Sequence, residues 1–212
     1  MMKINYQIKM EEHLDRIEKS GDTPRLLLHS CCGPCSSYVI SYLADYFHLD
    51  VIYYNPNIYP EDEYVHRKNE QIRLIEELET KNKLGFLDSE YEPDVFNSIA
   101  MGFEDEREGG LRCGECIKQR LEKTAFYASN HGYDYFTTTL SVSPHKNAQL
   151  INVLGFELEE KYGVSYLPAD FKKKGGFLKS IEIAKEHELY RQDYCGCKYS
   201  LAKSENRKGS RA

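Results

Sequence analysis

The chain has 212 residues, of which 41% are hydrophobic and 29% charged, a composition typical of an ordinary globular protein. No run of about 18 apolar residues is present, so the sequence predicts no membrane-spanning helix, and residues 1–22 lack the apolar core of a signal peptide. The net charge of −6 argues against a surface coated with basic residues for nucleic acid. Together these features predict a cytoplasmic protein with no membrane partner.

Short apolar runs alternate with amphipathic segments along the chain. The runs predict strands at Arg25–His29, Val51–Tyr54, Leu84–Leu87, Tyr135–Thr139 and Val164–Leu167. The helical periodicities predict helices over 34–47, 61–83, 114–129, 148–158 and 177–190, with a less regular stretch over 94–112. Such alternation predicts an α/β fold with a mostly parallel sheet and helices on both faces. In such sheets the ligand site lies beyond the carboxyl ends of the strands, here after the first strand.

No repeat or flexible linker divides the chain, so we expect one domain over residues 1–212. Its α/β core is expected over about residues 23–170, followed at 171–212 by a last helix, a Cys-Gly-Cys motif and a basic tail. The tail carries Lys203, Arg207, Lys208 and Arg211. From charge alone we interpret it as a frayed tail, and the run Lys172–Lys174 as a solvated loop.

Seven cysteines fall in three clusters: Cys31, Cys32 and Cys35; Cys113 and Cys116; Cys195 and Cys197. Seven thiols cannot all pair within one chain, and cytosolic thiols are kept reduced, so a disulfide framework is disfavoured. The first cluster follows the first predicted strand. Pro34 favours a helix start there, where free amides and the helix dipole lower the pKa of a thiol. Metal ligation is the inference that the clustering supports best.

The spacing leaves several kinds of site open. A structural zinc site needs four ligands, which would leave three thiols without a role. An iron–sulfur cluster takes three or four thiolates from irregularly spaced segments. The pair Cys32 and Cys35 alone would suit a thiol–disulfide oxidoreductase, and a zinc-stabilised RNA-binding module is a further alternative. An ATP-using enzyme of the same fold group is disfavoured, because Cys31–Cys35 occupies the place of its phosphate loop with only one glycine and with a proline that lacks an N–H.

Four segments resemble the QueH-type epoxyqueuosine reductases in sequence and order. They are H-S-C-C-G-P-C-S, E-G-G-L-R-C-G-E-C-I-K-Q-R-L, T-T-T-L-S-V-S-P-H-K-N and Y-R-Q-D-Y-C-G-C-K-Y-S, and they span Leu27–Ser200. The resemblance implies a Rossmann-like fold similar to the nucleotide α-hydrolase (HUP-like) group. It also implies the last step of queuosine synthesis, in which epoxyqueuosine at the wobble position of tRNA loses its epoxide oxygen. The resemblance further implies a [4Fe–4S] cluster beside a mononuclear iron, and a reaction without cobalamin.

This activity requires two electrons and two protons, so the resemblance implies an external low-potential electron donor as well as tRNA. We expect thiolates from all three motifs to share the two iron centres. Proton-donor candidates are the loop residues His145, Asp170 and Asp193, whereas His29, at the end of a buried strand, is interpreted as structural. Candidate phosphate contacts are Arg112, Arg120, Lys146, Lys172 and Arg191.

Overall fold

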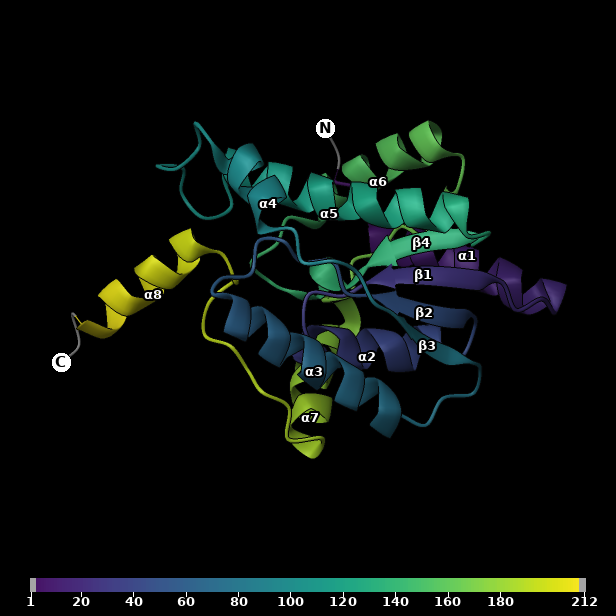
Figure 1. Ribbon diagram of the computed structural model, residues 1–212. Coiled ribbons are helices and arrows are strands. Elements are labelled where there is room, and N and C mark those ends of the chain that lie inside the picture. The colour runs from purple at the N-terminus through teal and green to yellow at the C-terminus, as the bar shows by residue number, and fades with distance from the viewer. Residues whose placement is uncertain (1–2, 210–212) are drawn as a thin grey trace.

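A five-stranded parallel sheet organises the protein, which a computed structural model describes over residues 3–209 (Figure 1). The strands are β1 Arg25–His29, β2 His48–Ile52, β3 Leu84–Leu87, β4 Tyr135–Thr138 and β5 Ser165–Tyr166. Their order is β3-β2-β1-β4-β5, and every neighbouring pair is parallel. The strand order reverses between β1 and β4, so the crevice beyond these two strand ends is the expected ligand site of such a sheet. The predicted α/β fold is confirmed.

Eight α-helices and two short 3-10 helices cover or flank this sheet within the described residues. The α-helices are α1 Tyr6–Ser20, α2 Gly33–Leu43, α3 Glu61–Glu77, α4 Pro93–Ala100, α5 Leu111–Asn130, α6 Ala148–Tyr162, α7 Gly176–Glu186 and α8 Lys198–Gly209. The 3-10 helices are η1 Thr139–Val142 and η2 Lys173–Gly175. Over residues 3–209, none of the helices has the length and apolar character needed to cross a membrane.

The leucines of β1 divide between two hydrophobic cores, one on each face of the sheet. Leu26 and Leu28 pack in the core that includes residues of α1 and α2, whereas Leu27 packs in the core formed with α5 and α6. All three side chains are fully buried, and burying each one stabilises the fold by about 1.5–3 kcal/mol. Because successive side chains of a strand point to opposite faces, the continuous apolar run of β1 is buried on both faces of the sheet, as expected for a central parallel strand.

Several predicted boundaries need correction. The fourth strand ends at Thr138, the fifth is Ser165–Tyr166, and the helix predicted over 34–47 ends at Leu43. The second strand is His48–Ile52, because it begins where His48 pairs with Arg25; Tyr53 and Tyr54 follow the strand and are buried beyond its end. The helix predicted over 61–83 ends at Glu77, where Leu78 turns to an extended backbone. The remaining polar residues lead into β3.

Three helices were not predicted from the sequence: α1, α4 and α8. The mixed charge of α1 hides an apolar stripe formed by Met10, Leu14 and Ile17, which is buried in the core. Helix α8 replaces the expected frayed tail over the part of the tail that the structure describes, whereas Arg211 lies outside the described residues. The last predicted helix, 177–190, is shorter and ends at Glu186.

Candidate metal centre

The first cysteine motif forms the turn between β1 and α2. The backbone fixes this turn: the Ser30 amide donates to the Ile52 carbonyl at 3.0 Å, and the Asn55 side chain donates to the Ser30 carbonyl at 2.8 Å. Cys32 is the N-cap residue of α2, and a proline occupies the first turn of the helix. The short connection thus brings its thiols directly to the switch point of the sheet.

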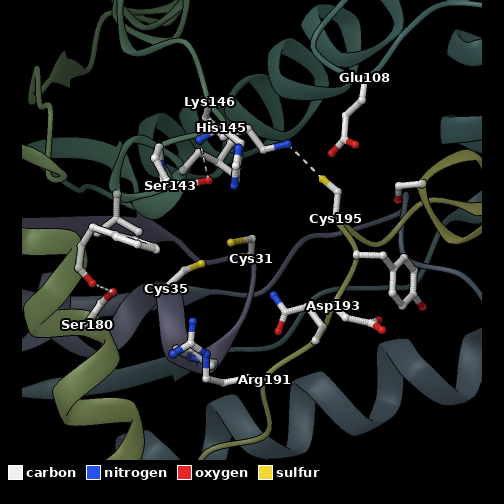
Figure 2. Close-up of a pocket in the computed structure, with 18 of the residues that line it drawn as sticks. Cys31, Cys35, Glu108, Ser143, His145, Lys146, Ser180, Arg191, Asp193 and Cys195 are labelled. Carbon is white, nitrogen blue, oxygen red and sulfur yellow. Dashed lines mark hydrogen bonds between the residues drawn. The ribbon is translucent and has the colours of Figure 1, made fainter. Parts of the chain in front are cut away.

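The sulfur atoms of Cys31, Cys32 and Cys35 all lie within 4.8 Å of one another. Cys31 Sγ also lies 3.8 Å from the hydroxyl of Thr139, which follows β4 across the switch point. Figure 2 shows the sulfurs of Cys31 and Cys35 directed toward one another at the cavity. Three converging thiols provide the soft donor set that iron–sulfur centres and zinc prefer, so this triad can bind a metal.

The three thiols of the triad differ in their acidity. Hydrogen bonds from Cys32 and Cys35, with a further contribution from the Arg120 cation, hold the pKa of Cys31 well below its usual value. Hydrogen bonding to Cys31 and burial raise the pKa of Cys32 to about 12, and the same causes raise the pKa of Cys35. Cys31 is therefore the most acidic thiol of the triad.

The second motif lies in the first turns of α5. Cys113 Sγ accepts a hydrogen bond of 3.2 Å from the Gly109 amide in the preceding loop. Cys116 is buried, and burial raises the pKa of its thiol to about 11. It belongs to a small buried cluster that also contains Cys197. The second and third motifs therefore meet at the start of α5.

The third motif crosses the carboxyl edge of the sheet between α7 and α8. The Tyr59 amide donates to the Gly196 carbonyl at 2.8 Å, and Arg67 donates to the Cys195 carbonyl at 3.4 Å. Gly196 has φ 133°, a backbone conformation that favours glycine, and a Cβ there would lie 3.1 Å from Ile58 Cγ1. The central glycine of the Cys-Gly-Cys motif is thus required by the turn and by its close packing.

Two cations, Lys146 and Arg120, interact with the thiols of this region. The Lys146 ammonium donates to Cys195 Sγ at 2.9 Å, as the dashed line in Figure 2 shows. Burial alone would lower the pKa of Lys146, but the adjacent Cys195 sulfur holds it above its usual value. Arg120 is buried on α5 and interacts electrostatically with Cys31, Cys113, Cys116 and Cys195, residues of all three motifs. The two cations balance thiolate charge, which would otherwise be costly to bury.

Arg120 is also fixed in place by hydrogen bonds. Its Nε donates to the Cys116 carbonyl at 3.1 Å, and its Nη1 donates to Asn55 Oδ1 at 3.5 Å. Arg112, a second arginine expected to contact phosphate, is buried, donates to the Phe103 and Glu104 carbonyls, and lies over the Tyr199 ring. Burial leaves Arg112 no exposed face for a phosphate.

A cavity of about 600 Å³ opens beside the triad. It is lined by thiols of the first and third motifs, by five cations and by two carboxylates. These are Cys31, Cys35 and Cys195; Arg120, Lys146, Arg191, Lys203 and Arg207; and Glu108 and Asp193. This volume is in the usual range for a small-molecule or nucleobase site, about 300–1,000 Å³.

The predicted proton-donor candidates lie in different places. His145 and Asp193 line the cavity (Figure 2). Asp170 is not among the lining residues, and its carboxylate pairs with Lys172 at 2.6 Å. His29 is fully buried and hydrogen-bonds Thr138 Oγ1 at 2.9 Å and the Tyr54 carbonyl at 3.0 Å. Burial lowers its pKa to about 4, so the imidazole is neutral and joins neighbouring elements.

The contacts of Gln192, Lys146 and Arg120 with the thiols were not predicted from the sequence. Gln192 Nε2 lies 3.1 Å from Cys32 Sγ. This contact connects the chain just before the third cysteine motif to the first motif. The available signal for Gln192 was its position immediately before Asp193 in the same motif. Lys146 and Arg120 were expected at phosphates because their charge was visible in the sequence and their burial was not.

The fold and the site define a class: a parallel α/β protein that gathers three cysteine motifs at the switch point of its sheet, with a thiol triad able to bind metal. Sequence comparison agrees with this class. The family model described as "Epoxyqueuosine reductase QueH" matches residues 26–203. The chain therefore belongs to the QueH family of epoxyqueuosine reductases.

Proteins named epoxyqueuosine reductase QueH resemble this chain over most of their length. The one from Staphylococcus epidermidis is 42% identical over 205 residues, which cover 95% of this chain and 86% of that protein. The one from Streptococcus pyogenes is 42% identical over 93% of this chain and 78% of its own length. The one from Thermotoga maritima is 35% identical over 83% and 90%, respectively.

Proposed function

We propose that this protein reduces the epoxide of epoxyqueuosine in tRNA to the cyclopentene of queuosine. Membership of the QueH family supports the reaction, and one structural observation carries it: the cysteine motifs gather around the end of β1, beside a cavity large enough for a nucleobase. Two electrons and two protons convert the epoxide oxygen to water as the carbon–carbon double bond forms. The reaction needs an external low-potential electron donor, and we place it in the cytoplasm with its tRNA substrate.

For the cofactors we propose a [4Fe–4S] cluster and a mononuclear iron shared among Cys31, Cys32, Cys35, Cys113, Cys116, Cys195 and Cys197. The donor set supports this proposal, since it is all sulfur and exceeds the four ligands that one centre needs. When bound, such centres supply electrons one at a time and a Lewis acid for oxygen. The triad has room for one centre, and the thiols of α5 and the third motif remain for the other.

The chain's own residues would orient the substrate and move protons. Asp193 and His145 line the cavity and are the proposed donors of the two protons to the departing oxygen. Lys146 and Arg120 would keep the charge of the thiolates balanced while electrons enter the site. The role of Asp170 stays a prediction, because its carboxylate pairs with Lys172 instead of lining the cavity.

The thiol–disulfide alternative is disfavoured by the acidity of the first motif. A redox-active Cys-x-x-Cys pair uses an accessible first thiol with a lowered pKa. Here Cys32 is 1% exposed, and its pKa is raised to about 12. The lowered pKa belongs to Cys31, outside the Cys-x-x-Cys pair.

The proposal is tested with protein purified under strict anaerobiosis. We expect a brown protein with more than four irons per chain, an electron paramagnetic resonance signal after reduction, and conversion of epoxyqueuosine in tRNA to queuosine with a low-potential chemical reductant. Mass spectrometry of the digested tRNA would follow the loss of one oxygen atom. Full activity with one iron or none per chain would overturn the two-centre proposal, and a colourless protein with stoichiometric zinc would favour an RNA-binding module.

A further inference from the structure

Helix α8 presents a polar stripe to the cavity. Ser200, Lys203, Ser204 and Arg207 all line it. Their spacing of three and four residues places them on one face of the helix. In Figure 1 the helix lies apart from the layers that cover the sheet. A helix packed into a globular core would carry an apolar stripe, whereas the cavity-lining residues of α8 are two hydroxyls and two cations.

The start of α8 is held against α4 and α5. The guanidinium carbon of Arg112 lies over the Tyr199 ring, 4.1 Å from the centre of the ring. The rings of Tyr199 and Phe96 also make an edge-to-face contact. Lys198 donates to Asn97 Oδ1 at 3.0 Å. Cys197, immediately before the helix, is buried with Cys116. The polar stripe is therefore presented from a fixed support directly beside the third cysteine motif.

We propose that this stripe of α8 binds the sugar–phosphate backbone of the anticodon stem-loop, beside the nucleotide whose modified base enters the cavity. The inference rests on the proposed function and names the surface that holds the substrate. Lysine, arginine and serine side chains are common phosphate contacts, and they fix the register of a nucleic acid without reading its sequence. Lys203 and Arg207 are about 6 Å apart along the helix axis, so their long side chains can reach different phosphates of one strand.

Other basic residues suit this role less well. Lys172 and Lys174 are paired with Asp170 and Glu11, and neither of them lines the cavity. Arg120 is buried, and Lys146 donates to Cys195. The protein as a whole is acidic, with a net charge of −6, which makes a local cluster of cations at the cavity the favoured place for a polyanion.

The test compares a charge reversal on α8, Lys203→Glu with Arg207→Glu, and the milder Lys203→Ala with Arg207→Ala. The matched control is Lys81→Glu with Lys83→Glu, two exposed lysines just before β3 at the opposite end of the sheet. Fluorescence anisotropy would give the Kd of the iron-loaded protein for an unmodified anticodon stem-loop RNA. Iron content, visible spectrum and Tm verify that each variant is intact.

We expect the charge reversal to raise Kd on the order of tenfold or more. The alanine pair should lower the slope of log Kd against log salt concentration by about 1.4, the change expected when two phosphate contacts to single-stranded RNA are lost. The control should change Kd by less than twofold. Equal weakening by the control, or wild-type affinity in the charge reversal, would overturn the proposal. If the wild-type protein binds RNA through α8 but leaves the epoxide of the modified tRNA intact, the docking surface stands and the proposed function fails.

Discussion

Lys146 and Cys195 illustrate how single residues set the chemistry of this site. The ammonium donates to the sulfur at 2.9 Å, and both side chains border the cavity. An ammonium held against a thiolate stabilises negative charge on the sulfur and fixes its direction. Together with the buried Arg120, it provides positive charge where electrons are proposed to enter.

Replacing Lys146 by methionine should remove this charge while keeping an unbranched side chain of similar length. We expect the reduction potential of the iron centre to become more negative, because an added electron loses a nearby cation, and turnover to fall on the order of tenfold, typical of residues that support metal ligands. A redox titration followed by electron paramagnetic resonance measures the potential. Lys146→Arg should restore most of it, and Lys172→Met, which removes a lysine paired with Asp170, is the control. An unchanged potential in Lys146→Met would contradict this role.

At the scale of elements, the site depends on how α6 packs against the sheet. Helix α6 begins with Asn147 as its N-cap, whose side chain accepts hydrogen bonds from the Gln149 and Leu150 amides. Lys146 directly precedes this cap, which fixes the backbone at the start of the helix. Further along, Gly155 lets the helix approach Tyr166 of β5: an ideal Cβ there would lie 2.3 Å from the tyrosine ring. This close approach fixes α6 against β5.

Gly155→Ala should therefore destabilise the protein even though alanine favours a helix. The added methyl group must displace a buried ring, which costs about 1–3 kcal/mol. In a protein of this size that loss lowers Tm by roughly 2–4 °C per kcal/mol. Thermal unfolding followed by circular dichroism measures the change. Val153→Ala, on the exposed side of the same helix, should leave Tm nearly unchanged; a stabilised Gly155→Ala protein would mean that the ring has room to move.

For the whole molecule, the cysteine motifs connect parts that are distant in the sequence. The segment before α8 is fixed across the sheet edge by hydrogen bonds to three other regions: Gln192 to Cys32, Lys146 to Cys195, and the Tyr59 amide to Gly196. All three of these contacts are hydrogen bonds. A metal bound to thiols from these motifs would therefore contribute much of the stability of this segment.

Removing iron by anaerobic chelation should loosen this part of the molecule first. We expect faster amide hydrogen exchange over residues 190–209, while β1 and β4, whose leucine and phenylalanine side chains are fully buried, stay protected. Hydrogen-exchange mass spectrometry of the iron-loaded and chelated protein measures both regions. Exchange that rises equally in the sheet, or that stays unchanged over 190–209, would show that the thiols do not support the segment in this way.

The sequence by itself determined the alternation of five strands with helices along the chain, and the cysteine inventory. The bounds of β1 and β3 are as predicted, since a short apolar run encodes a buried strand locally. Helix α8 was missed because its residues carry no apolar stripe, and α1 because its charge masked the stripe that packs on the core. Hydrophobic periodicity arises where one face of a helix is buried, so it predicts poorly those helices whose faces are all polar.

The tertiary structure decided which of these residues meet. It brought Cys31, Cys32 and Cys35 within 4.8 Å, placed Lys146 against Cys195, and put Asp193 and His145 at the cavity but not Asp170. Lys146 and Cys195 are 49 positions apart, and Gln192 and Cys32 are 160 apart. Such pairings depend on how the crossover helices return the chain to the carboxyl edge of the sheet, whereas strand and helix patterns depend on neighbouring residues alone. The seven thiols were therefore visible in the sequence, and their arrangement with Lys146 and the buried Arg120 became visible only in the fold.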